Sequence, residues 1–352
     1  DHRDLHSFPT RRSSDLMLRN IVTGLGGPAN GIPTETGFDI TVASELMAVL
    51  CLATDLDDLR ARLDRLVVGI KRDGSAYTCK ELGATGSLMA LLLEAMKPNL
   101  VQTLEGNLAF VHGGPFANIA HGCNSVVATK AAMTLGDWAI TEAGFGSDLG
   151  AEKFLNIKCR AAGLKPCAIV LVTSTKALKW HGGVPLPDIG KPDVEALKKG
   201  ISNLDAHIDN LKHFGPQIVV SLNHFATDTE EEIEIIRAHC ASRGVLFAVC
   251  DGFSLGGKGA IELAQAVMKA AQSEPEALNF SYEADDDIVT KITKLATGVY
   301  GAADIELSPA AQKDLKQIQE LGFNRLPASA GHGDGIRCGG RAVLGGNGER
   351  PD

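Results

Sequence analysis

The runs Cys167-Ala-Ile-Val-Leu-Val172 and Gln217-Ile-Val-Val-Ser-Leu222 decide the fold of this 352-residue chain. Nearly every side chain in them is apolar, which is typical of strands buried on both faces in a parallel sheet. A helical pattern separates the two runs, and helices and strands continue to alternate on either side. The sequence therefore predicts an α/β protein with a mostly parallel sheet flanked by helices.

Working outward from these runs, hydrophobic periodicity gives the expected order of elements. Strands are predicted at residues 65–70, 99–103, 137–142, 167–173, 216–222 and 245–250. Helices are predicted at 41–64, 80–96, 118–135, 150–162, 192–213, 228–242 and 257–273. No internal repeat interrupts this alternation.

The composition narrows the class of protein. With 44% hydrophobic and 22% charged residues the chain is of the globular type. A net charge of −9 argues against a grip on nucleic acid phosphates. No apolar run approaches the length of a membrane span, and the eight cysteines form no CxxC pair. We expect an intracellular, cytoplasmic protein with reduced thiols, no structural metal, and neither nucleic acid nor membrane as partner.

Ligands of such sheets bind where strands end and loops lead into helices. After the strand predicted at 137–142 comes Gly144-Phe-Gly-Ser-Asp-Leu-Gly150, whose glycines allow close backbone approach to an anion. The spacing is not that of a dinucleotide fingerprint, so tight-turn packing is an equal alternative. We consider Gly144 a candidate phosphate contact.

Two histidines flank the glycine-rich stretch 113–118. His112 and His121 could donate to an anion or move protons near neutral pH. A structural role for each is the more ordinary interpretation, and nothing here has the spacing of a zinc site.

Further candidates follow the later strands. Lys176 and Lys179 come after the strand at 167–173 and are expected to emerge at the sheet edge, where they could contact phosphate or simply be solvated. Phe225 and Phe253 come after the next two strands. Paired aromatic rings there could sandwich a flat heterocycle, although filling the core is the commoner role.

Long motifs add a resemblance to these observations. They are Glu35–Glu45, Gln102–Ser125 and Thr141–Phe154, within a match that runs from about Met17 to Leu326. The chain resembles the formate–tetrahydrofolate ligase family. The resemblance implies a three-layer, P-loop NTPase-like fold in a cytosolic homotetramer. It also implies ATP-dependent ligation of formate to tetrahydrofolate through formyl phosphate, with ATP (Mg²⁺) and tetrahydrofolate as substrates and activation by a monovalent cation.

Site residues carry over position by position. Phe145, Gly146 and Ser147 match the loop that lies along the formyl phosphate in that family. Phe225 with Ala226 stands where the family has a Phe-Pro pair beside the pterin, and Phe253 stands in place of a tryptophan on the opposite wall. The smaller ring offers less stacking area and no indole donor. Loss of the proline loosens the loop.

The resemblance also predicts the organisation of the chain. Residues 1–16 are interpreted as a non-native or disordered leader, 17–275 as a partial nucleotide- and folate-binding core, 276–326 as the start of a C-terminal domain, and 327–352 as a frame-shifted or disordered tail. No GxxxxGK[ST] loop occurs in the chain. The chain is therefore interpreted as a fragment of a ligase, inactive alone.

Two other functions stay open. A nicotinamide- or flavin-dependent oxidoreductase would use Gly144–Gly150 as its pyrophosphate loop, but it needs an acidic residue after the next strand, where Thr173-Ser-Thr-Lys176 stands instead. A non-catalytic folate-binding module would bind folate without turnover.

Overall fold

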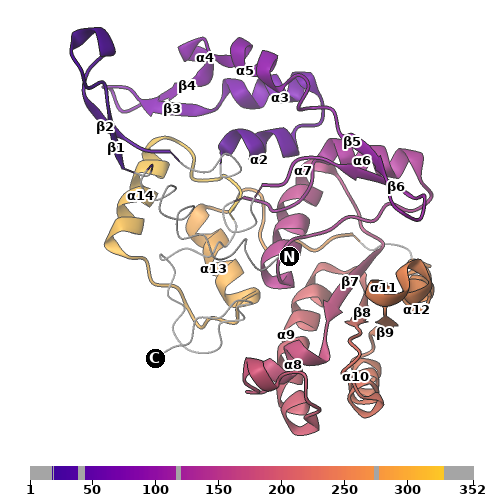
Figure 1. The fold of residues 1–352 in the computed structure, drawn as a ribbon. Coiled ribbons are helices and arrows are strands. Elements are labelled where there is room, and N and C mark those ends of the chain that lie inside the picture. Colours follow the sequence, from indigo (N-terminus) through magenta and orange to yellow (C-terminus); the bar gives the residue numbers. More distant parts are fainter. Residues whose placement is uncertain (1–17, 19, 39–43, 116–119, 273–276, 329–352) are drawn as a thin grey trace.

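The computed structural model describes residues 18, 20–38, 44–115, 120–272 and 277–328 (Figure 1). The predicted leader 1–16 and nearly all of the predicted tail 327–352 lie outside these residues. Within them the chain has a mixed α/β fold. The division into domains at residues 275 and 326 stays a prediction.

The strands are short and fall into four small sheets. They are β1 (Ile21–Thr23), β2 (Thr34–Thr36), β3 (Val67–Ile70), β4 (Ala76–Thr78), β5 (Asn99–Gln102), β6 (Leu108–Val111), β7 (Ala168–Thr173), β8 (Gln217–Asn223) and β9 (Leu246–Cys250).

The helices are more extensive than the strands. The α-helices are α2 (Glu45–Leu52), α3 (Leu56–Asp64), α4 (Cys79–Leu82), α5 (Thr85–Leu92), α6 (Val126–Leu135), α7 (Arg160–Ala162), α8 (Thr175–His181), α9 (Val194–Phe214), α10 (Glu230–Ser242), α11 (Gly252–Leu255), α12 (Ile261–Ala270), α13 (Ile288–Gly298) and α14 (Pro309–Glu320). Short 3₁₀ turns are η1 (Pro28–Asn30), η5 (Leu186–Asp188) and η6 (Gly256–Ala260), and π-type turns are η3 (Ser147–Ala151) and η4 (Phe154–Cys159).

The parallel sheet that the two apolar runs predicted is confirmed, with strand order β7-β8-β9. Leu171 lies opposite Val220, and Ser221 lies opposite Ala248. The central strand β8 is buried from Ile218 to Leu222 because helices cover the sheet. Figure 1 shows α9 on one side of the strands and α12 on the other.

The predicted strands at 65–70 and 99–103 do form, but not in the parallel sheet. β3 pairs with β4 and β5 pairs with β6, both antiparallel. The cause is the turn that follows each strand: Gly74 and Gly106 have φ of 86° and 85°, which glycine adopts without strain. A tight turn sends the chain straight back, so each strand finds its partner locally.

The strand predicted at 137–142 is wrong. No strand forms there, and Ile140 is 91% exposed. A strand needs a neighbour to accept and donate its backbone hydrogen bonds, and none of the described strands pairs with this run. Its apolar residues therefore form an irregular segment without a strand partner.

Several predicted helices are interrupted by their own capping residues. The helix expected at 41–64 becomes α2 and α3, because the Asp55 side chain accepts from the Asp58 N–H (2.8 Å) and starts a new helix. The helix expected at 80–96 breaks at Gly83, in the left-handed region. The helix expected at 118–135 begins only after Ser125, and residues 118–119 lie outside the described part.

The helix expected at 150–162 is confirmed, but it begins at Ser147 and is mostly of π type. Such turns are rare and occur often at functional sites. Its last part is fixed to a later segment. The Arg160 guanidinium lies 3.9 Å from the centroid of the Phe280 ring, and the Asn156 amide donates to Ser281 Oγ (3.1 Å).

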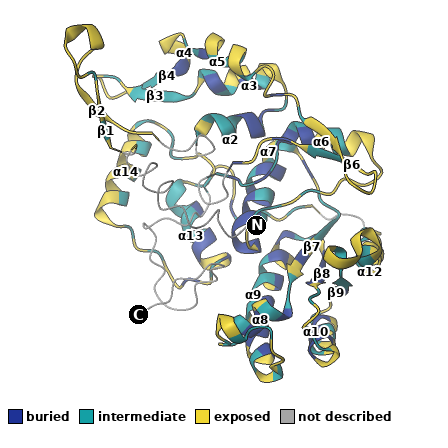
Figure 2. Ribbon diagram, in the orientation of Figure 1, coloured by how far each residue is buried: buried dark blue, intermediate teal, exposed yellow. Residues whose placement is uncertain are grey.

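The main hydrophobic core lies between the sheet and helices α8–α10. Figure 2 shows many buried residues along α9, whereas the β1–β2 hairpin is exposed. Glycines allow α8 and α9 to pack closely: a Cβ on Gly200 would fall 1.8 Å from the Leu178 carbonyl oxygen. This core holds the carboxyl edge of the sheet, from which the predicted folate residues extend.

Candidate functional site

The loop before the helical segment 147–162 has an unusual backbone. Phe145 has a φ of 62°, the only positive φ of a non-glycine among the described residues, and its ring is 64% exposed. A bulky residue in this region is strained, and such strain is concentrated at functional sites. The loop therefore presents an aromatic ring and a constrained backbone to solvent.

The glycines of this loop are required for packing. A Cβ on Gly150 would fall 1.6 Å from the Gly144 carbonyl oxygen, and the Gly150 N–H donates to the Gly146 carbonyl (2.8 Å). The tight-turn alternative thus accounts for Gly150. Whether Gly144 also contacts phosphate stays a prediction.

The two richest stretches of sequence meet here. The Gly144 N–H donates to the Gly122 carbonyl (3.4 Å), which brings the His121 loop beside the Phe145 loop. Ser147, which follows the Phe145 loop, is 9% exposed, and its hydroxyl lies 2.6 Å from Nδ1 of His207 on α9. The sequence analysis missed His207, since 60 residues separate it from Ser147 and no motif marks it.

His112 is buried with both ring nitrogens occupied. Nε2 lies 2.6 Å from the Ala95 carbonyl oxygen, and Nδ1 lies 2.5 Å from Ser125 Oγ. A carbonyl only accepts, so Nε2 carries the proton, and in the neutral ring Nδ1 accepts from the Ser125 hydroxyl. Ser125 in turn caps α6 by accepting from the Ala128 N–H (3.0 Å). These contacts favour the structural alternative for His112.

His121 is placed differently. It is 2% exposed, and its Nε2 has no hydrogen-bond partner among the described residues. Burial first, and then the nearby charges of Lys158 and Lys153, lower the pKa of His121 to about 4. The ring is therefore neutral near pH 7 and available as a hydrogen-bonding group.

Two buried lysines accompany His121. Lys158 Nζ donates to Asn124 Oδ1 (2.6 Å) and to Thr129 Oγ1 (2.9 Å), and burial lowers its pKa. Burial also lowers the pKa of Lys153 to about 8, although Glu152 and Cys123 oppose this shift. The sequence analysis assigned no role to either lysine, because nothing in the local pattern distinguishes them from exposed residues of a helix.

The structure places the two predicted phosphate lysines in different surroundings. Lys176 is partly exposed, and its Nζ lies 3.9 Å from the centroid of the Phe225 ring. Lys179 does not emerge at the sheet edge as expected. It is fully buried on α8, where Nζ lies 3.1 Å from Glu232 Oε1 and donates to the Lys191 carbonyl (2.9 Å). Lys179 lies one helical turn beyond Lys176 on the same side of α8, deeper in the protein, where its side chain is fully buried.

The predicted folate residues come from neighbouring strand ends. Asn223 lies opposite Cys250, and the His224 N–H donates to the Cys250 carbonyl (3.0 Å), so Phe225 and Phe253 follow adjacent strands. Phe253 is 97% exposed on α11 and Ala226 is also exposed. An aromatic side chain this exposed does not fill the core. One face of the Phe225 ring is already covered by the Lys176 ammonium.

The loop that carries Phe253 is fixed from a distance. The Gly257 N–H donates to Glu105 Oε1 (2.7 Å), so the tip of the β5–β6 hairpin contacts the segment after α11. A Cβ on Gly257 would fall 2.5 Å from the same carboxylate. Glu105 lies in the motif Gln102–Ser125, but no sequence pattern indicates that Gly257 is its partner.

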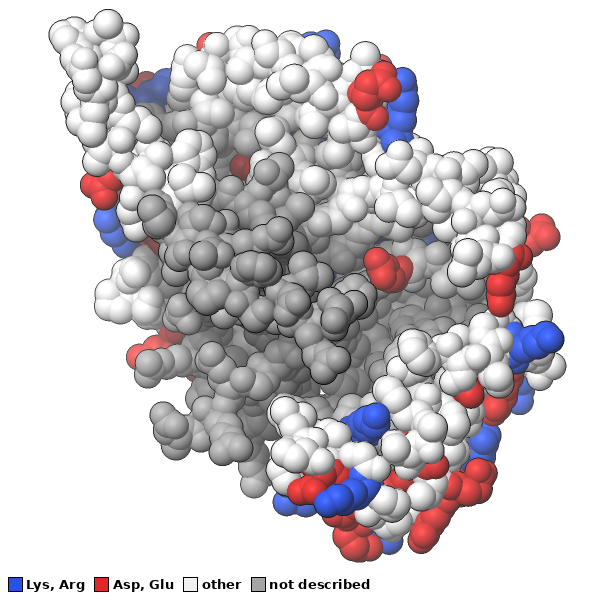
Figure 3. Space-filling view, in the orientation of Figure 1, with Lys and Arg blue, Asp and Glu red and all other residues white. Residues whose placement is uncertain are grey.

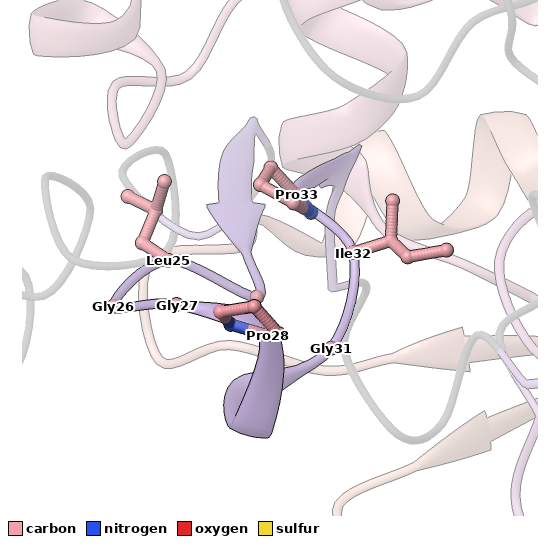
Figure 4. A pocket seen from close by; sticks show the side chains of 8 residues that line it. Leu25, Gly26, Gly27, Pro28, Gly31, Ile32 and Pro33 are labelled. Carbon is pink, nitrogen blue, oxygen red and sulfur yellow. The ribbon is translucent and has the colours of Figure 1, made fainter.

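A cavity lies elsewhere, at the tip of the β1–β2 hairpin (Figure 4). It has a volume of about 390 Å³ and is lined by Gly24, Leu25, Gly26, Gly27, Pro28, Gly31, Ile32 and Pro33. No ionisable side chain lines it, and none of the predicted site residues belongs to it. It offers no chemistry for the candidate site.

Three further observations concern the described residues as a whole. None of their helices is long and apolar enough to cross a membrane. No group of three or more His, Cys, Asp or Glu side chains among them is arranged to hold a metal ion. On the face seen in Figure 3, acidic and basic side chains are interspersed over the part formed by α8–α10 rather than separated by sign.

Comparison with known proteins follows the same motifs. The sequence model of the formate–tetrahydrofolate ligase family matches residues 9–331. The chain is 53% identical over 315 residues to formate–tetrahydrofolate ligase of Parabacteroides distasonis, and 54% identical over 315 residues to that of Phocaeicola vulgatus. Each match covers 89% of this chain and 57% of the relative, so the chain spans little more than half the length of these proteins. The chain belongs to the formate–tetrahydrofolate ligase family.

Proposed function

We propose that this chain takes part in the ATP-dependent ligation of formate to tetrahydrofolate, which yields 10-formyltetrahydrofolate, ADP and phosphate. The observation that carries the proposal is the family match across residues 9–331, which includes every predicted site residue. The strained, exposed Phe145 loop and the exposed aromatic residue at the sheet edge support it. Family membership does not favour the oxidoreductase alternative.

The reaction divides into two displacements. A formate oxygen attacks the γ-phosphorus of ATP and ADP leaves, giving formyl phosphate. The N10 amine of tetrahydrofolate then attacks the formyl carbon, phosphate leaves with the carbon–oxygen bonding electrons, and the amine loses a proton. Such steps depend mainly on positioning and on charge stabilisation.

We assign the residues as follows. Phe145, Gly146 and Ser147 lie along the formyl phosphate, and Phe225, Ala226 and Phe253 bind the pterin. Because Lys176 covers one face of the Phe225 ring, the pterin stacks on the other face or displaces the ammonium. Of the two histidines, His121 is the one with a free ring nitrogen among the described residues, so proton movement is assigned to it rather than to His112.

The finer expectations belong to the same proposal. They are a three-layer P-loop NTPase-like architecture, a homotetramer and a cytoplasmic location. ATP enters as its Mg²⁺ complex, as a substrate. Activation by a monovalent cation is a further expectation from the resemblance, and no step of the mechanism uses one.

A chimera tests the proposal. The 315 matched residues of the Parabacteroides distasonis relative are replaced by those of this chain, and formate-dependent formation of 10-formyltetrahydrofolate is measured. We expect turnover in the chimera, and a loss of about 5- to 150-fold in kcat/KM for tetrahydrofolate after Phe225→Ala or Phe253→Ala, since base–aromatic stacking contributes about 1–3 kcal/mol. Leu186→Ala, at an exposed leucine, is the control.

The outcome separates the proposal from its alternative. Folate binding without turnover in a folded chimera would favour a non-catalytic folate-binding module. Turnover that is insensitive to both phenylalanine substitutions would refute the assigned pterin site while leaving the reaction intact.

A further inference from the structure

The hydroxyl of Ser147 is held by a residue from another part of the chain. Ser147 Oγ lies 2.6 Å from His207 Nδ1, and Ser147 is only 9% exposed. His207 lies in the middle of α9, a 21-residue helix that packs on the main core through Leu204 and Ile208. The histidine therefore connects the candidate loop to the longest helix among the described residues.

The same imidazole fills the space beneath Gly146. A Cβ on Gly146 would lie 3.6 Å from His207 Cε1 and 2.4 Å from Asp148 Oδ1. Ring, carboxylate and hydroxyl thus converge on one side of the Gly146–Ser147 backbone. A side chain at position 146 would displace the Asp148 carboxylate from this cluster, which is a reason for a glycine whose φ of −72° does not itself require one.

When an anion is bound, hydrogen-bonding rules decide which of Ser147 and His207 donates in the contact between them. A phosphoryl oxygen accepts only, so Ser147 must donate its single proton to the ligand. His207 Nδ1 must then carry a proton and donate it to Ser147 Oγ. Burial lowers the pKa of His207, against the opposing charge of Asp148, so the neutral ring donates as the tautomer that carries its proton on Nδ1.

We infer that His207 is a positioning residue of the phosphoryl-binding loop, orienting the Ser147 hydroxyl as a donor toward the phosphoryl group of an acyl phosphate. The inference rests on the proposed function, since it takes the Phe145–Ser147 loop as the formyl phosphate site. It extends that function by adding a residue from α9 that touches no substrate and acts through Ser147.

A pair of substitutions at one position tests this role. In the 352-residue chain, His207→Asn keeps an N–H donor near the place of Nδ1, whereas His207→Leu removes it. Binding of inorganic phosphate and of acetyl phosphate is titrated by ³¹P NMR, and folding is followed by thermal melting. We expect His207→Leu to weaken binding of both probes about tenfold, the loss typical of one hydrogen bond to a charged group, and His207→Asn to stay within about threefold.

A double-mutant cycle shows whether His207 acts through Ser147. Ser147→Ala should weaken binding as much as His207→Leu, and the double variant should be no weaker than either single one. His213→Leu, at an exposed histidine of the same helix, should leave binding unchanged. Tighter binding of acetyl phosphate than of phosphate would identify an acyl phosphate site rather than a free phosphate site.

The experiment distinguishes a wrong assignment of the loop from a wrong role for His207. If the unsubstituted chain binds neither probe, both the loop assignment and the role of His207 are overturned. If the chain binds but the leucine variant binds equally well, only the role of His207 is overturned and the proposed function stands. Equal losses in the asparagine and leucine variants, or additive losses in the cycle, would reduce His207 to a space-filling residue.

Discussion

Two regions of this chain use similar apolar segments to build very different strands. In the sheet β7-β8-β9, strand β8 is buried from Ile218 to Leu222, whereas all residues of β5 (Asn99–Gln102) in the hairpin region are exposed. β7 and β8 are each followed by a helix and pair in the parallel sheet, whereas β3 and β5 are each followed by a glycine turn and fold back into hairpins. The connection that follows a strand, rather than the composition of the strand, decides where its side chains lie.

The largest contrast is expected between two ion pairs. Lys179 and Glu232 are fully buried, whereas Lys71 and Glu81 form an exposed pair at 2.5 Å. Lys179→Met leaves a buried carboxylate without its cation, which should cost about 3–5 kcal/mol in the free energy of unfolding. Lys71→Met should cause no measurable change. Urea denaturation measures the free energy of unfolding of both variants. Equal losses in the two variants would contradict the contrast between the buried and the exposed pair.

The buried pair also has a pH dependence. Burial alone would raise the pKa of Glu232, but the Asp193 N–H, the Lys179 ammonium and Thr229 together lower it below 4.5. A lowered pKa contributes stability that is present above the unfolded value and is lost as pH falls through the folded value. Unfolding measured from pH 6 downward should show this loss, and Glu232→Gln should remove it.

A leucine in each region gives the next contrast. Leu222 on β8 is fully buried, and Leu100 on β5 is 52% exposed. Leu222→Ala should lower the free energy of unfolding by about 2–5 kcal/mol because it leaves a cavity. Leu100→Ala should change it by no more than about 0.5 kcal/mol. A cost at Leu100 similar to that at Leu222 would mean that the hairpins are covered in solution.

Two equally buried glutamates with different hydrogen-bond partners give a more precise comparison. Glu152 is as buried as Glu232, but one of its oxygens has no hydrogen-bond partner among the described residues. Burial raises the pKa of Glu152 to about 7, against the opposing effects of Asn156 and Lys153. A raised pKa favours the folded state at low pH, and this stability is lost between about pH 4.5 and 7. Glu152→Gln should be more stable than the parent at pH 8, on the order of 2–3 kcal/mol.

Equilibrium unfolding at pH 5 and pH 8 checks this prediction. The difference between Glu152→Gln and the parent should be large at pH 8 and small at pH 5. A difference that does not vary with pH would show that the carboxyl group is ionised in the folded protein throughout this range.

The smallest effect concerns the contact that joins the two regions. Glu105, at the tip of the β5–β6 hairpin, accepts from the Gly257 N–H. Glu105→Gln should weaken this bond by about 1 kcal/mol and speed hydrogen exchange of the Gly257 amide about fivefold, with global stability unchanged. Glu94→Gln, at an exposed carboxylate near the hairpin, is the matched control. Unchanged exchange would mean that the hairpin does not hold the Phe253 loop in solution.

Much of the fold could be predicted from the sequence, for a definable reason. The strands at 168–173, 217–223 and 246–250 and the helices between them carry continuous apolar or periodic patterns. The errors arose where short-range chemistry overrides these patterns: the Asp55 cap, Gly83, and the turns at Gly74 and Gly106. The strand expected at 137–142 failed because a strand depends on a neighbour, which a local pattern does not contain.

The candidate site was predictable only in part. The Phe145 loop and the two edge phenylalanines follow from motif resemblance, and in the structure Phe145 and Phe253 are exposed whereas Phe225 is partly buried. Contacts between distant segments, such as Ser147 with His207 and Glu105 with Gly257, leave no trace in local spacing. Lys179 shows that a local pattern can also mislead. Its position after a strand suggested the sheet edge, but it lies one helical turn further along α8, where it is buried.

Because residues 154–159 form π-type turns, the number of residues in this segment determines which way the following residues face. Each residue of a helix rotates the chain by about 100°, and a π turn holds one residue more than an α turn. A deletion of one residue within Phe154–Cys159 would leave the segment helical but turn Arg160 away from Phe280. A sequence alignment would record a single gap there. The protein would lose the attachment of residues 280–282 without any side chain having been exchanged.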